Sequence, residues 1–193
     1  MTEDMKADKK EVIRKAAVDV IAEYGYYNTS ISQIAERAAV AVGTIYNYFE
    51  NKEEILEYIF SVELEKRIKF LKELKEKEIS VWGKIKKFLE MHFAEVRRNT
   101  AAAKISVREK EFPRAAHSGA IAEYRSQIPE QIKKIVQEAV AKGEMREHNI
   151  EIISAMIFAS VHGIVERAIK NDNFAVLQEA PEEVIDLLKN GLK

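Results

Sequence analysis

The chain has 193 residues, enough for a small domain joined to a larger one, and two unequal parts are expected. It contains no cysteine, which excludes disulfides, thiolate metal sites and thiol nucleophiles, and its charged N-terminus lacks the apolar core of a signal peptide, so a cytoplasmic protein is expected. The formal net charge of -1 does not indicate nucleic-acid binding, so any such function must rest on where the charges and hydrogen-bond donors lie.

Helical periodicity runs through the chain and strand alternation is nearly absent, which predicts an all-α fold. About nine helices are predicted, over residues 6–24, 30–38, 42–48, 51–77, 80–98, 101–111, 119–142, 149–171 and 181–190. The most apolar run, residues 152–165, is too short for a membrane span. It is therefore predicted to be a buried helix, and no membrane association is expected.

The first 50 residues predict a compact three-helix unit. Apolar residues recur at helical spacing in the first helix until Gly25, a residue suited to a left-handed helix end. Thr29 or Ser30 offers an N-cap to a short second helix, and a turn over residues 39–41 leads to a third helix from Val42. Two short helices joined by so tight a turn form a helix-turn-helix, whose second helix can enter the major groove of DNA.

Hydrogen-bond donors gather around the predicted third helix, on the face opposite the inward-facing Ile45 and Phe49. Hydroxyl, amide and ammonium groups of this kind suit phosphate oxygens. The residues are Thr44, Tyr46, Asn47, Tyr48 and Lys52. A plain three-helix bundle with surface tyrosines is the alternative, and it leaves the register of these residues unexplained.

The run ISQIAERAAVAVGTIYNYFENKEEIL, within residues 10–56, resembles the helix-turn-helix signature of the TetR family of bacterial transcriptional regulators. The resemblance implies that the five donors above touch phosphates and that Ser32, Ala41 and Val42 approach base edges. It also implies that Gly43 lets the backbone come close to DNA. With Thr29 and Ser30, these are the predicted DNA-binding residues, in a domain over residues 1–52.

Two residues depart from the family pattern. Ala39 stands where the turn glycine is usual, so the turn must form without a left-handed glycine or with some strain. Glu50 stands where a lysine or serine is common. Its charge would weaken DNA binding unless a neighbour such as Lys52 offsets it.

Residues 53–193 are predicted to form an effector-binding and dimerisation domain. The helix over residues 80–98 carries an apolar stripe that could line a cavity, although by itself such a stripe is more often ordinary core packing. A DNA-binding module has no need of so large a companion unless the companion senses a ligand or dimerises. The predicted ligand-binding residues are Trp82, Phe88, His92, Phe93, Val96, Arg108, Tyr124, Ile128, Met156, Val161 and His162.

The runs VREKEFPRAAHSGAIAEYRSQIPEQIKKIVQEAVAKGEM and MIFASVHGI are similar to a subgroup of TetR regulators that sense fatty acyl-CoA. The resemblance implies an acyl-CoA effector, with Arg108 among the arginines available to its head group. A free fatty acid and a lipophilic drug-like cation remain alternatives. A cation would require several buried carboxylates, whereas the helix over residues 80–98 offers only Glu90 and Glu95, which favours a neutral or anionic ligand.

The helix over residues 149–171 is apolar nearly all round, which one subunit cannot easily bury. Together with the helix over residues 181–190, it is predicted to form a four-helix bundle across a homodimer. The predicted interface residues are Ile153, Ile157, Ser160, Ile164, Val184, Leu187 and Leu188.

A helical-bundle enzyme or metal-binding protein is the alternative from another class. His92 and His162 lie on apolar helix faces, and no histidine follows a glutamate at the Glu-x-x-His spacing of di-iron bundles. No catalytic residue, metal ligand or cofactor is therefore predicted. The sequence favours a homodimeric repressor that a small hydrophobic effector, best matched by a fatty acyl-CoA, releases from a palindromic operator.

Overall fold

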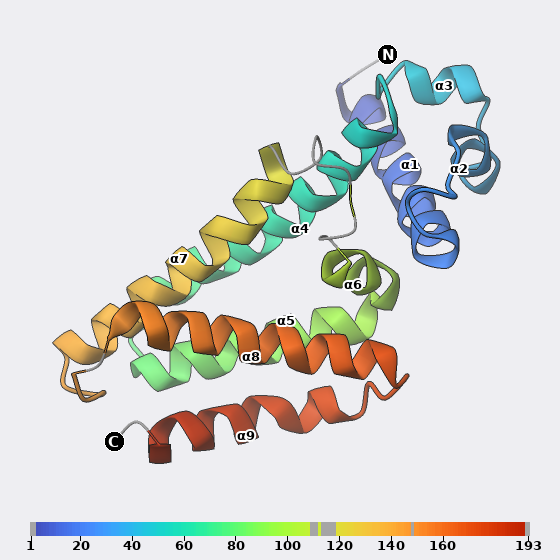
Figure 1. The fold of residues 1–193 in the computed structure, drawn as a ribbon. Coiled ribbons are helices and arrows are strands. Elements are labelled where there is room, and N and C mark those ends of the chain that lie inside the picture. Colours follow the sequence, from blue (N-terminus) through green and yellow to red (C-terminus); the bar gives the residue numbers. More distant parts are fainter. Residues whose placement is uncertain (1–2, 109–111, 113–118, 148, 192–193) are drawn as a thin grey trace. The chain divides into compact units, whose positions relative to one another are not determined.

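The structure is a computed structural model that describes residues 3–108, 112, 119–147 and 149–191 (Figure 1). All regular structure in these residues is helical, which confirms the all-α prediction. The helices are α1 (Glu3–Tyr24), α2 (Ile31–Arg37), α3 (Val42–Tyr46), α4 (Lys52–Lys75), α5 (Val81–Arg98), α6 (Thr100–Val107), α7 (Gly119–Ala141), α8 (Ile150–Lys170) and α9 (Val176–Gly191). Residues 109–111, the end of one predicted helix, lie outside the described residues.

The chain forms two compact units, each assembled from two separate stretches. The first takes residues up to 63 and residues 101–123, and the second takes residues 64–100 and those from 124 onward. α4 and α7 therefore contribute to both units. The sequence predicts a boundary between two functional domains after residue 52. The boundary between the compact units lies elsewhere, because the start of α4 is buried in the first unit. The division at residue 52 therefore stays a prediction about function.

The first unit is built around a small apolar core. α1 places Ile13 and Ile21 at helical spacing, and both side chains are almost completely buried. Gly25 follows α1 with φ of +81°, a left-handed conformation that costs glycine little. Ser30 starts α2 through a capping box: the N–H of Gln33 donates to Ser30 Oγ at 3.2 Å, and the N–H of Ser30 donates to Gln33 Oε1 at 2.7 Å.

The second unit contains a bundle in which α5, α8 and α9 pack against one another (Figure 1). α5 buries the predicted apolar stripe, and the side chains of Phe88 and Phe93 are nearly inaccessible to solvent. Glu144, just after α7, fixes the start of α5. Its carboxylate accepts the N–H of Val81 at 2.9 Å, and its backbone carbonyl accepts Nε1–H of Trp82 at 3.1 Å.

The start of α9 differs from the prediction. The sequence predicts a helix over residues 181–190, because prolines and glycines mark the breaks between helices, whereas α9 begins at Val176 and carries Pro181 in its interior. The added residues bury Leu177 and Ala180 on the side that also buries Ile185. Burial of this stripe outweighs the hydrogen bond that a proline cannot donate.

α8 is long and apolar enough to cross a membrane by length and composition. One side of it, including Ile153, Ile157 and Val161, is buried within the bundle, which confirms the predicted buried helix for that side. The other side leaves Ile152 and Met156 56% and 57% exposed. These exposed apolar side chains make this side of α8 a candidate for the predicted dimer interface.

Candidate DNA-binding surface and effector chamber

The turn of the helix-turn-helix contains an alanine in a left-handed conformation. Ala39 has φ of +52°. Its N–H donates to the carbonyl of Glu36 at 3.1 Å, and the N–H of Val40 donates to the carbonyl of Ala35 at 3.0 Å, the pattern of a Schellman motif. Of the two outcomes expected for this departure from glycine, the strained turn is the one observed.

α3 buries one side and exposes the other. Ile45 and Phe49 are completely or almost completely buried, while Val42 and Tyr46 are 39% and 55% exposed. Among the predicted DNA-binding residues, Ser30, Ser32, Ala41, Val42, Gly43, Tyr46 and Asn47 are exposed, and Thr44 and Tyr48 are half-buried. These positions are accessible to a DNA duplex, and their contacts with DNA remain a prediction.

Thr29 and Lys52 have structural partners in place of the predicted phosphate contacts. The Thr29 side chain is buried, and its hydroxyl donates to the carbonyl of Gly25 at 2.8 Å. Lys52 Nζ donates to the carbonyls of Tyr26 at 2.6 Å and Thr29 at 2.7 Å, and it lies 4.3 Å from the centre of the Tyr26 ring. Burial lowers the pKa of Lys52. Two of its three N–H donors therefore hold the segment before α2, which corrects the prediction for both residues.

Glu50 is exposed just before α4. Its N–H donates to Glu54 Oε2 at 2.6 Å, and the N–H of Glu54 donates to Asn51 Oδ1 at 2.8 Å, so Asn51 caps the helix. Lys52, the neighbour that could offset the Glu50 charge, has its ammonium group bound to the carbonyls of Tyr26 and Thr29. We therefore expect the Glu50 charge to weaken the attraction of phosphates to this surface.

A chamber inside the second unit collects six of the eleven predicted ligand-binding residues. These are Phe88 and His92 of α5, Tyr124 and Ile128 of α7, and Val161 and His162 of α8. Arg67 of α4, Ile132 of α7 and Phe158 of α8 complete the lining. The cavity volume is about 40 Å³, little more than the space one water molecule occupies.

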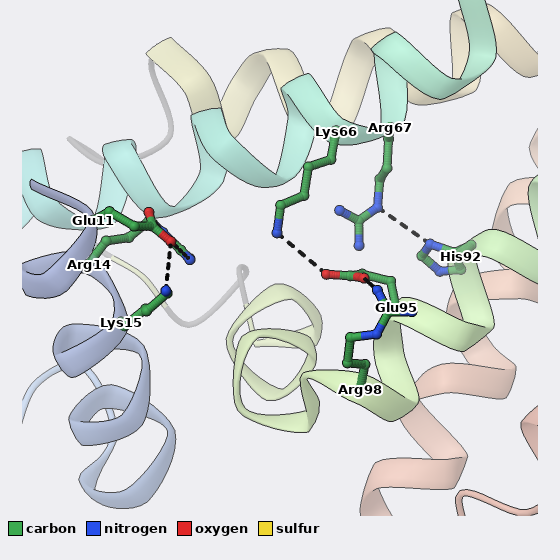
Figure 2. A network of polar contacts seen from close by, with 8 residues as sticks. All are labelled: Glu11, Arg14, Lys15, Lys66, Arg67, His92, Glu95 and Arg98. Atoms are coloured by element: carbon green, nitrogen blue, oxygen red, sulfur yellow. Dashed lines mark hydrogen bonds and ion pairs between the residues drawn. The ribbon is translucent and has the colours of Figure 1, made fainter. Parts of the chain in front are cut away.

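Arg67 brings a buried positive charge to this chamber. Its side chain is 5% exposed, and its Nε–H donates to Nδ1 of His92 at 3.4 Å (Figure 2). The guanidinium lies 5.4 Å from the centre of the Tyr124 ring. Burial, reinforced by the charge of Arg67, lowers the pKa of His92 to about 3. The imidazole is therefore neutral at physiological pH and can accept this hydrogen bond.

Glu95, one helical turn after His92 on α5, does not line the chamber. Glu95 accepts a hydrogen bond from Lys66 at 3.4 Å and from Arg98 at 3.2 Å (Figure 2). None of the described lining residues is a carboxylate. The chamber therefore offers apolar, aromatic and basic groups.

The remaining predicted ligand residues lie elsewhere. Phe93 and Val96 are buried but do not line the cavity, which fits ordinary core packing. Trp82 donates a hydrogen bond to the backbone carbonyl of Glu144. The side chain of Met156 is exposed, on the far side of α8. Arg108 belongs to the first unit, where it lines a separate pocket of about 190 Å³.

Three chamber residues were missed by sequence reasoning, although each lies at helical spacing from a residue that was recognised. Arg67 lies in α4 between the buried Leu64 and Leu71, but it is a charged residue in a charged run, which is typical of a solvated helix face. Ile132 lies one turn after Ile128, and Phe158 one turn before His162. The spacing could have identified all three.

The predicted dimer residues divide into two groups. Ile153 and Ile157 are buried inside their own subunit, so they cannot offer their side chains to a partner, and the prediction is wrong for them. Ser160 and Leu187 are exposed, with Leu187 at 72%, and Ile164, Val184 and Leu188 are half-buried. Ile152 and Met156, which were not predicted for the interface, are the large exposed apolar residues of α8.

A tight turn between two short helices, an accessible α3 and a separate helical unit with an internal chamber define a ligand-sensing, DNA-binding transcriptional regulator. The family model for bacterial regulatory proteins, tetR family, matches residues 13–59, and that for the tetracyclin repressor-like C-terminal domain matches residues 78–166. The chain belongs to the TetR family of transcriptional regulators. Its relatives are regulators rather than enzymes, and regulators of the family act as dimers.

Similar proteins extend over nearly the whole chain. The fatty acid metabolism regulator protein of Bacillus subtilis (strain 168) is 29% identical over 188 residues, covering 97% of this chain and 97% of that protein. The solved structure of the fatty acid degradation regulator FadR from Bacillus halodurans is 30% identical with a TM-score of 0.84, covering 96% of each chain. The structure of FadR from Bacillus subtilis in complex with stearoyl-CoA is 29% identical with a TM-score of 0.85, covering 95% of this chain and 99% of that one.

Proposed function

We propose that this chain is a repressor that binds a palindromic operator as a homodimer and that a fatty acyl-CoA releases it. The observation that carries the proposal is the lining of the chamber, which combines aromatic and aliphatic side chains with Arg67 and two histidines. An apolar chain joined to a neutral or anionic group suits this lining, whereas a lipophilic cation would meet a buried positive charge. The similar regulator that was solved with stearoyl-CoA supports the same class of effector.

The size of the chamber bears on the mechanism. Sites for ligands of this size enclose roughly 300–1,000 Å³, whereas this cavity holds about 40 Å³. An acyl chain must therefore separate side chains on α4, α5, α7 and α8 as it enters. Effector binding then favours a different arrangement of these helices, and α4 starts next to the predicted DNA-binding residues.

The DNA-binding side of the proposal rests on the accessible residues of α3. Two copies of α3 in a homodimer would read half-sites about one helical turn apart, ~34 Å, or slightly more. Phosphate contacts would make the affinity fall steeply as salt concentration rises. Regulators of this kind are typically cytoplasmic, and we propose the same location for this chain.

The test is a gel-shift titration against the DNA upstream of the chain's own gene. Stearoyl-CoA, stearic acid and a lipophilic cation are each added to the preformed complex. We expect stearoyl-CoA to release the DNA and the cation to leave it bound. Release by stearic acid alone would assign the effector to free fatty acids, and release by the cation alone would overturn the proposed class.

Mutation of α3 provides a second measurement. Tyr46→Phe removes a hydroxyl from an exposed ring, and Gln178→Ala changes an exposed side chain on α9. Tyr46→Phe should weaken operator binding at least about tenfold, because one hydrogen bond to a charged oxygen contributes about 1.5–3 kcal/mol, and Gln178→Ala should leave it unchanged. Equal operator binding by the two variants would remove Tyr46 from the DNA-binding surface.

A further inference from the structure

The second unit contains another cavity besides the chamber, and the function proposed above does not use it. It is an open groove of about 570 Å³. Its lining includes Lys72 and Lys75 of α4, Lys84 of α5 and Lys134 of α7, with Leu71 and Ile135 among its apolar residues. The groove has the volume of a ligand site, and its chemistry differs from that of the chamber, because lysines dominate it.

The charges in this groove are only partly compensated. Lys84 is buried, and its Nζ donates to Glu138 Oε1 at 3.0 Å and to the carbonyl of Lys75 at 3.2 Å. The side chains of Lys72, Lys75 and Lys134 are exposed, and none of them forms an ion pair with another residue in the part of the chain that the structure describes. Glu138, the one carboxylate among the described lining residues, is already paired with Lys84 and Lys142, so these three ammonium groups have no carboxylate of their own.

The groove continues the chamber along the same two helices. On α4, Arg67 lines the chamber and Leu71 lines the groove one turn later. On α7, Ile132 lines the chamber and Ile135 lines the groove about one turn later. Residues that line the chamber and residues that line the groove thus lie within one helical turn of each other on both helices. An elongated ligand could occupy both the chamber and the groove.

We infer that the groove binds the phosphate-bearing head of the acyl-CoA whose chain enters the chamber, an inference that rests on the proposed function. Lysine ammonium groups bind phosphate as point charges, and several of them together suit a head group with more than one phosphate. The apolar floor contacts the uncharged part of the head. A free fatty acid has a single carboxylate and gains much less from the groove.

The test compares two double variants that remove the same charge. Lys72→Gln with Lys134→Gln neutralises the groove, whereas Lys69→Gln with Lys87→Gln removes two exposed lysines that do not line it. Calorimetric titrations with stearoyl-CoA and with stearic acid are run on both variants and on wild type at several salt concentrations. The buried Lys84 is left in place, so the core is unchanged.

The groove variant should bind stearoyl-CoA about tenfold more weakly than wild type, because two exposed charge contacts are lost, and its affinity should depend less on salt. Its binding of stearic acid, its operator affinity without effector and its unfolding midpoint should match those of the control variant. Equal stearoyl-CoA binding by the two variants would overturn the inference, as would a matching loss for stearic acid, which would place the effect in the chamber. A wild type that binds no stearoyl-CoA would instead overturn the proposed function.

Discussion

Ala39 holds a left-handed conformation that costs an alanine roughly 1–2 kcal/mol. Ala39→Gly should raise the free energy of unfolding by about 1 kcal/mol, because glycine relieves the strain but adds freedom to the unfolded chain. The neighbouring Ala38 has φ of -80°, so Ala38→Gly should lower it by about 0.5–1 kcal/mol. Urea unfolding of both variants measures the difference, and a loss of stability in Ala39→Gly would contradict the strain.

Lys52 shows how a residue expected on DNA can act on the fold. Lys52→Met keeps the aliphatic stem but removes the ammonium donor from the carbonyls of Tyr26 and Thr29, of which that of Tyr26 still accepts the N–H of Thr29. The free energy of unfolding should fall by about 2 kcal/mol, because hydrogen bonds that involve a charged group contribute about 1.5–3 kcal/mol. Tyr46→Phe, at an exposed position, is the control and should leave the urea midpoint unchanged. An unchanged urea midpoint in Lys52→Met would show that Lys52 does not stabilise the fold, and would leave phosphate binding as its predicted role.

At the scale of elements, the first turn of α7 depends on a residue from α4. Glu57 Oε2 accepts the N–H of Ala120 at 2.5 Å, so a side chain distant in sequence supplies the N-terminal cap. Glu57→Ala should lower the free energy of unfolding by about 1 kcal/mol, a typical cost for a lost cap. Glu65→Ala removes an exposed carboxylate from the same helix and should have little effect. Equal thermal midpoints in the two variants would show that the cap does not stabilise the fold.

The same carboxylate has a pH dependence. Burial raises the pKa of Glu57 above its ordinary 4.5, so the folded chain binds this proton more readily than the unfolded chain. The contribution of Glu57 to stability is then largest at low pH and declines as the pH rises through and above 4.5. Glu57→Gln cannot ionise, so wild type should lose stability relative to this variant as the pH rises. A constant difference between the two chains across this range would contradict the raised pKa.

At the scale of the whole molecule, exposed apolar side chains on α8 and α9 are candidates for the surface that contacts a second subunit. We propose that Leu187, 72% exposed, lies in the interface with Ile152 and Met156. Leu187→Glu should weaken the dimer by about 3 kcal/mol, because two buried leucines are lost and two charges face each other. Gln178→Glu adds the same charge nine residues away, on the opposite side of α9, and should leave the dimer intact. Sedimentation equilibrium measures both, and an intact dimer in Leu187→Glu would exclude this surface.

The sequence by itself determined the all-α fold, the helix-turn-helix and most of its accessible residues. These depend on neighbours within a few turns: the Ser30 cap, the Gly25 end and the spacing of Ile45 and Phe49. The turn at Ala39 was recognised as a problem for the same reason, since a left-handed position is a local requirement.

Only the tertiary structure decided which side chains from helices far apart in the sequence contact one another. It turned Lys52 towards Tyr26 and placed Arg67 beside His92 in a chamber, because burial depends on what packs against a face as well as on the spacing along it. It also divided α8, where periodicity could not distinguish the buried Ile157 from the exposed Met156 on a helix that is apolar nearly all round. Contacts between residues far apart in the sequence leave no periodic signal. Such contacts form the chamber and the lysine-lined groove, and they decide which side of α8 is exposed.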